Sequence, residues 1–293
     1  MELQWPLIIF TTLVAWSAGL FAAQCALVFK GEAQKAQLPA LITSFVLLCV
    51  GGVAVFFHLQ HWERIFNGFG HITSGITQEL VAIVLAVVVM VVFFVFLRRE
   101  SGKVPAWVAV LGMAMSAILV CVMAHSYLMA ARPAWNSIVW ILYVLGNACV
   151  LGPATMAVIC SLVDKDAASS KLLGMLALVG SAINGLLSIA FLFVMNAAAG
   201  SVSAIDYYFD PTEPNRALVD PSTFSVFSGE LMLVSVLGVI VIGAIVPIVA
   251  SFVGSKQKSW ALWGSIAAIA AFVGAICMRV VFYQMGFSVC TLF

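Results

Sequence analysis

Four histidines are the side chains of this chain best suited to proton transfer, because an imidazole gains and loses a proton near neutral pH. They are His58, His61, His71 and His125, and each follows a long apolar segment or lies near the end of one. A membrane topology built from these segments puts all four at the same, outward-facing edge of the bilayer. Ionisable groups at such a depth are costly and usually face a partner, a cavity or a ligand. Four further polar residues share this depth: Glu79, Tyr127, Arg279 and Tyr283.

The composition indicates that these residues are carried by an integral membrane protein. Of 293 residues, 64% are hydrophobic and 9% are charged, and the mean hydropathy is +1.16. Soluble domains carry roughly 25% charged residues. The N-terminus has no Lys or Arg before its first apolar run, so a cleaved signal peptide is not expected.

Eight apolar runs are long enough to cross the bilayer as helices. A hydrocarbon core about 30 Å thick needs about 20 helical residues, whereas a β-barrel would show alternating segments of about ten. The predicted fold is therefore all-α: a polytopic membrane protein of eight transmembrane helices, forming a single domain over residues 1–293 that divides at most into two four-helix groups, about 1–131 and 132–293. The predicted spans are Leu7–Phe29, Ala40–Phe57, Leu80–Leu97, Val108–Ala130, Val139–Val163, Leu172–Met195, Glu230–Val253 and Leu262–Gly286.

The basic residues are unevenly shared between the two faces. Nine follow the first, third, fifth and seventh spans, and three lie in the other connections. Because cytoplasmic loops carry the excess of Lys and Arg, the odd-numbered loops are predicted to be cytoplasmic and both termini extracytoplasmic. The nine are Lys30, Lys35, Arg98, Arg99, Lys103, Lys165, Lys171, Lys256 and Lys258.

Two outer connections are too long to be simple turns. In the first, from His58 to Glu79, apolar residues recur at helical spacing and predict a short amphipathic helix in the headgroup region. The second, from Asn196 to Gly229, is acidic and broken by prolines. It is either a solvated connector or a docking surface for an extracytoplasmic partner. The apolar residues of the first are Leu59, Trp62, Phe66 and Phe69.

The cysteines show no metal-binding pattern. Six of the seven lie within apolar runs and none forms a CxxC pair, so they are interpreted as packing residues. Neither a P-loop nor a GxGxxG turn occurs in the sequence. We therefore expect no iron–sulfur cluster in this chain; our preferred interpretation also has no other metal, no haem and no catalysis by the chain on its own.

A lipid-soluble quinol is a substrate that suits His, Glu, Arg and Tyr at the edge of a bilayer. Its oxidation releases two protons and two electrons. Neutral His58 can hold one quinol oxygen and accept its proton. Glu79 can pass a proton to water, and an arginine can stabilise negative charge on the ring. The sequence offers no redox centre for the electrons, so they must leave to another subunit.

Two other functions stay open at this point. His58 and His125 lie on different spans at similar depth, and they could serve as axial ligands of a b-type haem in a cytochrome subunit. A transporter would need ionisable residues at the bilayer midplane. There the sequence offers chiefly Asn147 and Asn184.

Several short patches occur in an order that follows a known family over nearly the whole chain. They are Trp5 to Thr11; His58-Leu59, Arg64, Phe66-Asn67 and Glu79; Pro133, Trp135 and Ser137; Gly152-Pro153; and Arg279, Phe282 and Tyr283. With these patches the chain resembles the membrane-anchor subunit of the dimethyl sulfoxide reductase family of molybdoenzyme complexes. It departs from the family pattern at Gln60, His61 and Trp62, and His125 stands where the family has an arginine.

This resemblance implies a membrane anchor in anaerobic respiration that binds menaquinol as its substrate. The electrons would pass to an iron–sulfur subunit and a molybdopterin catalytic subunit, docked on the extracytoplasmic face of the bacterial cytoplasmic membrane. The family pattern assigns His58 to the quinol site and Glu79 to the same region, whereas His61 and His71 are expected to be interfacial. The predicted quinol-binding set is His58, Arg64, Glu79, His125, Tyr127, Arg279 and Tyr283.

Overall fold

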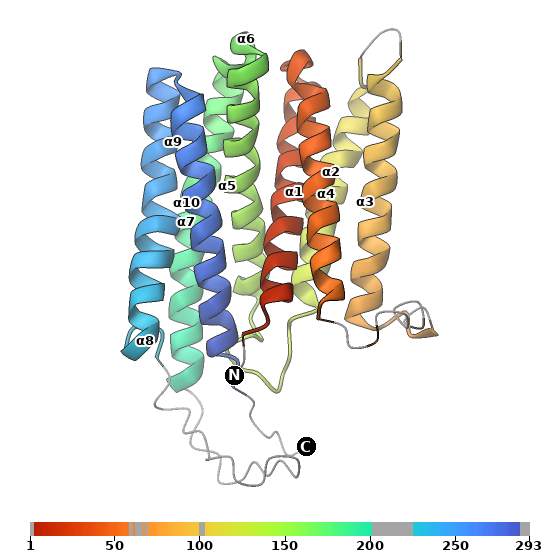
Figure 1. Cartoon of the computed structure of the whole chain (residues 1–293). Coiled ribbons are helices and arrows are strands. Elements are labelled where there is room, and N and C mark those ends of the chain that lie inside the picture. Colours follow the sequence, from red (N-terminus) through yellow and green to blue (C-terminus); the bar gives the residue numbers. More distant parts are fainter. Residues whose placement is uncertain are drawn as a thin grey trace.

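The computed structural model describes residues 3–58, 61, 67, 70–99, 103–200 and 225–287. Over these ranges the chain is all-helical, and its long helices run up and down side by side (Figure 1). Eight helical segments of the described chain are long and apolar enough to cross a membrane, which confirms the predicted number of spans. In chain order the elements are α1 (Trp5–Phe29), η1 (Gln34–Ala36), α2 (Gln37–Phe56), α3 (Gly75–Leu97), α4 (Ala106–His125), α5 (Ile138–Val163), α6 (Lys165–Ala168), α7 (Lys171–Gly200), α8 (Gly229–Met232), η4 (Leu233–Ile245), α9 (Val246–Gln257) and α10 (Trp260–Gln284).

Three predicted boundaries were wrong by five residues at the end of the bundle that carries the histidines, and one of them is the end of α7, at Gly200 rather than Met195. α3 begins at Gly75 rather than Leu80, which places Glu79 inside the span. The hydropathy pattern missed this first turn because it is polar. α4 ends at His125 rather than Ala130. The hydroxyl of the next residue, Ser126, lies 2.8 Å from the Met123 carbonyl as the chain leaves the helix, and its single proton is shared between this carbonyl and Glu79.

The connections divide between two ends of the bundle. The α1–α2, α3–α4 and α9–α10 connections and the short helix α6 lie at one end, where all nine basic residues of the odd-numbered loops gather; we call it the basic end (Figure 1). α1 begins and α10 ends at the other end, which carries His58, His71 and His125 and which we call the histidine end. The start of the first helix and the end of the last helix thus lie at the same end of the bundle, which agrees with the predicted topology. The side of the membrane that each end faces stays a prediction.

A labelling experiment tests this orientation. In intact cells, Lys256→Cys is expected to resist a membrane-impermeant maleimide added from outside, because the excess of positive charge keeps the basic end in the cytoplasm. Asn136→Cys, exposed in the α4–α5 connection at the histidine end, is the matched control and is expected to react. Efficient labelling at Lys256→Cys with none at Asn136→Cys would invert the topology.

The centre of the bundle is formed by α1 and α5, the two spans that the rest of the protein covers most. Their backbones touch where Gly19 crosses Gly152 and Ala148. A Cβ on Gly19 would overlap the Ala148 carbonyl, and one on Gly152 would overlap the Gly19 backbone. Small residues at such crossings give membrane helices close van der Waals contact, which replaces the hydrophobic driving force that lipid does not supply.

The two long connections of the histidine end fall mostly outside the described residues. This applies to the predicted amphipathic helix, whose four apolar residues lie outside, and to the acidic segment 201–224. Both stay predictions.

Candidate functional site

Glu79 is a buried carboxyl group at the histidine end. It lies in the second turn of α3, and its side chain is 9% exposed. The hydroxyl of Ser126, just past the end of α4, donates to Glu79 Oε1. α3 comes this close because its first residue is Gly75, where an added Cβ would stand 2.8 Å from Ser126 Cβ. The two helix ends thus hold the carboxyl group in a fixed position.

Two tyrosines lie near this carboxyl group, both of them buried. Burial raises the pKa of Tyr127 well above its usual value, the neighbouring Tyr283 and Glu79 raise this pKa further, and Arg279 lowers it. Tyr127 therefore stays protonated near neutral pH and keeps an O–H to donate. The Tyr283 hydroxyl is buried next to that of Tyr127 and forms no hydrogen bond with any other described residue.

Arg279 is buried in α10, with 1% of its surface exposed. Its Nε donates to Thr11 Oγ1 (2.8 Å), and its Nη2 donates to the Thr11 carbonyl (3.2 Å). Its Nη1 faces Tyr143 Oη and Asn147 Oδ1, each at 3.5 Å, and the Ala275 carbonyl at 3.2 Å. One guanidinium thus joins α1, α5 and α10. Because most of its donors are used inside the protein, it acts as a fixed cation more than as a free ligand.

An aromatic stack fixes the α4–α5 connection against α10. Phe282 lies between two indoles, 4.5 Å from the Trp135 ring and 4.1 Å from the Trp140 ring. Trp135 Nε1 donates to the Phe282 carbonyl (2.6 Å), and Trp140 Nε1 donates to the Ala124 carbonyl (3.1 Å). Tyr127 packs edge-on against the same stack. This stack positions both tyrosines.

The structure divides the predicted site residues into two groups. Glu79, Tyr127, Arg279 and Tyr283 come together as one buried cluster, which we call the inner cluster. His58 and His125 are exposed at the same end of the bundle. His58 Nδ1 donates to Gln4 Oε1 (3.0 Å), ahead of α1.

The remaining polar residues that the sequence analysis named are not members of the inner cluster. Arg64 lies outside the described residues, and His61 and His71 are exposed. The two midplane asparagines are buried between helices: Asn147 accepts from Arg279, and Asn184 Nδ2 donates to the Gly243 carbonyl (3.0 Å). They hold helices together, which gives no support to a transport pathway.

Ser126, Trp140 and Tyr143 belong to the site and were not predicted from the sequence. Aromatic residues are common at membrane interfaces in any case, so neither Trp140 nor Tyr143 carried a distinguishing signal. Ser126 directly follows His125, and only the contact with Glu79 reveals it. Within the described part of the chain, no group of three or more His, Cys, Asp or Glu side chains could hold a metal ion.

A family model described as DMSO reductase anchor subunit (DmsC) matches residues 1–285. The chain belongs to this family. No curated protein matches the sequence. As a DMSO reductase anchor subunit, the chain is a multi-pass membrane protein that serves as the membrane anchor of an oxidoreductase complex.

Within the described residues, patches at the start, middle and end of the chain that carry the resemblance meet in space although they are far apart in the sequence. Thr11 bonds Arg279 across 268 positions, and Trp135 bonds Phe282 across 147. Gly152 meets α1 at Gly19. These described patches thus link α1, α10 and the α4–α5 connection toward the histidine end of the bundle.

Proposed function

We propose that this anchor subunit binds menaquinol at the histidine end and takes part in its oxidation. The observation that carries the proposal is the inner cluster: a buried carboxyl group, two buried phenols and a fixed cation within one apolar, aromatic frame. A quinol reaches such a place from the lipid phase and needs donors and acceptors for its two oxygens. The buried hydroxyls of Tyr283 and Tyr127 supply them.

Glu79 is the proposed first proton acceptor. Oxidation of the quinol breaks two O–H bonds and releases two electrons. A carboxylate within hydrogen-bond reach of a reacting O–H takes its proton in the transition state. Ser126 holds one oxygen of Glu79 and leaves the other free for this task. Arg279 contributes positive potential, which stabilises negative charge as it develops on the ring.

His58 is the proposed second proton acceptor. Because its Nδ1–H is used by Gln4, the neutral ring presents Nε2 as an acceptor. Its exposure lets the proton pass on to water. His125 is exposed at the same end and is proposed as a second contact to the quinol.

The electrons are proposed to leave to partner subunits. We propose an iron–sulfur subunit and a molybdopterin catalytic subunit on the extracytoplasmic face of a bacterial cytoplasmic membrane. The family description, a reductase anchor subunit, supports such a complex. The acidic segment 201–224 follows α7 at the same end as the inner cluster and is the proposed docking surface.

The test is His58→Ala in the assembled complex. We expect menaquinol-analogue oxidation to fall on the order of 10²-fold, the usual contribution of a general base, with normal amounts of complex in the membrane. The matched control is His71→Ala, since His71 is exposed at the same end. Normal turnover in assembled His58→Ala would remove His58 from the site.

A further inference from the structure

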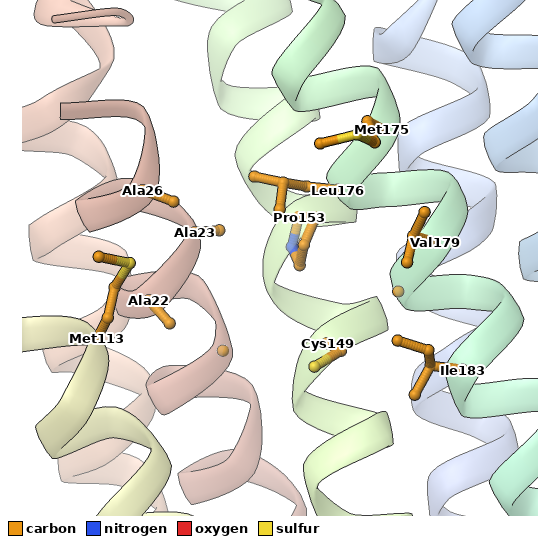
Figure 2. A pocket seen from close by; sticks show the side chains of 12 residues that line it. Ala22, Ala23, Ala26, Met113, Cys149, Pro153, Met175, Leu176, Val179 and Ile183 are labelled. Carbon is orange, nitrogen blue, oxygen red and sulfur yellow. The ribbon is translucent and has the colours of Figure 1, made fainter. Parts of the chain in front are cut away.

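An apolar groove runs along the bundle in the half nearer the basic end. It has a volume of about 370 Å³. Its floor is α5, at Cys149 and Pro153, and its two walls are α1 and α7 (Figure 2). At Gly180 the α7 backbone touches the Cys149 carbonyl, where a Cβ would overlap it. The α1 wall is made only of small residues, which leaves the space open: Gly19, Ala22, Ala23 and Ala26.

The surroundings of the groove suit a hydrocarbon chain. Its α7 rim consists of Met175, Val179 and Ile183, whose side chains are 56%, 49% and 40% exposed. The groove therefore opens sideways from the bundle, at a depth where the surrounding solvent is lipid. An empty apolar space loses dispersion contacts on every wall, and water has no polar partner there. An acyl chain fits this lining.

Two lysines lie beyond the groove, toward the basic end of the bundle. Lys30 follows Ala26 by four residues at the end of α1, and Lys171 precedes Met175 by four in the first turn of α7. Residues four apart lie on the same helix face, so each lysine continues one wall of the groove toward the headgroup region. Both side chains are exposed, and Lys30 Nζ lies 5.7 Å from the centroid of the Phe29 ring.

Three described carboxylates lie at this end, against its nine basic residues: Glu32, Asp164 and Asp166, the last of them exposed. Glu32 accepts a hydrogen bond from the Ser170 hydroxyl. Asp164 accepts from the backbone N–H groups of Lys35 (3.2 Å) and Ala167 (3.4 Å). The two lysines thus leave positive charge at the mouth of an apolar groove, the combination that an anionic phospholipid complements.

We propose that the groove between α1 and α7 binds one acyl chain of an anionic phospholipid whose headgroup phosphate pairs with Lys30 and Lys171. This site is separate from the inner cluster. Glu79 and Tyr283 lie at the opposite end of the bundle, so a quinol ring placed there would be at the wrong end to use these lysines (Figure 1).

Spin-labelled phosphatidylglycerol in phosphatidylcholine nanodiscs is the probe, with the assembled complex as the protein. We expect the wild type to immobilise the label. The double change Lys30→Gln with Lys171→Gln is expected to weaken this binding about thirtyfold, since each lysine near an anionic surface contributes about fivefold. Ala26→Phe, or Ala22→Leu if the larger side chain lowers assembly, fills the groove and is expected to remove the immobilised population.

Matched controls change the same residue types away from the groove. They are Lys256→Gln with Lys258→Gln, and Ala261→Phe on the exposed face of α10, and both are expected to bind like the wild type. Unchanged immobilisation in both groove variants would overturn the proposal. So would displacement of the label by a menaquinone analogue, because the quinone would then be the occupant.

Discussion

Glu79→Gln is expected to lower menaquinol-analogue oxidation on the order of 10²- to 10³-fold in a complex that assembles normally, because a general base contributes this much. Glutamine has nearly the same shape and still accepts from the Ser126 hydroxyl, so the packing of α3 against the end of α4 is kept. It cannot take up a proton. The loss should therefore appear in kcat rather than in the amount of complex, as measured by steady-state turnover and immunoblotting of membranes.

Glu230→Gln is the matched control for this change. Glu230 is an exposed carboxylate in the first turn of α8, also at the histidine end. Its neutralisation should leave turnover unchanged, because a change in surface charge alone does not remove a proton acceptor. A Glu79→Gln complex that turns over within a factor of two of the wild type would exclude Glu79 as the base.

Arg279→Met is expected to lower the amount of assembled chain, with a loss of stability of about 3 kcal/mol. The change leaves Tyr143 Oη and Asn147 Oδ1 buried without their donor and cuts the link from α10 to Thr11. Each unsatisfied buried acceptor costs about 1–3 kcal/mol. Arg279→Lys keeps the charge but cannot reach three helices at once. It should give an intermediate loss in thermal denaturation of the solubilised complex.

Arg98→Met is the matched control, because Arg98 is exposed after α3 at the basic end. We expect wild-type assembly there. If Arg279→Met assembled and melted like the wild type while only quinol turnover fell, Arg279 would be a direct ligand of the quinol and not the cation that joins the three helices.

The number of spans was predictable because hydropathy acts over about 20 residues and tolerates local error. The helix boundaries near the site were not predictable, since they depend on single polar residues. Thr77, Gln78 and Glu79 read as a connection, yet Thr77 and Glu79 are buried in the first turns of α3. A polar side chain can lie inside a span when a neighbouring element satisfies it, and the sequence does not show that neighbour.

The sequence predicted the depth of the candidate site in the membrane, but not which of its residues contact one another. Glu79, Tyr127, Arg279 and Tyr283 share one end of the bundle, as the apolar pattern indicated. Their meeting depends on the order in which helices pack, above all on Thr11 of α1 lying against Arg279. His58 and His125 were expected to belong to the site and His61 and His71 to be interfacial, and the structure leaves all four exposed. The groove between α1 and α7 had no sequence signal, because alanine and glycine are common at any helix crossing.

A single-turnover measurement tests the quinol site most directly. A menaquinol analogue is mixed with wild-type and Glu79→Gln complexes, and reduction of the partner's iron–sulfur clusters is followed by electron paramagnetic resonance. The proposal predicts rapid reduction in the wild type and a rate on the order of 10²-fold lower in Glu79→Gln, with equal rates in both when dithionite reduces the clusters directly. Equal rates with the quinol would contradict oxidation at the inner cluster.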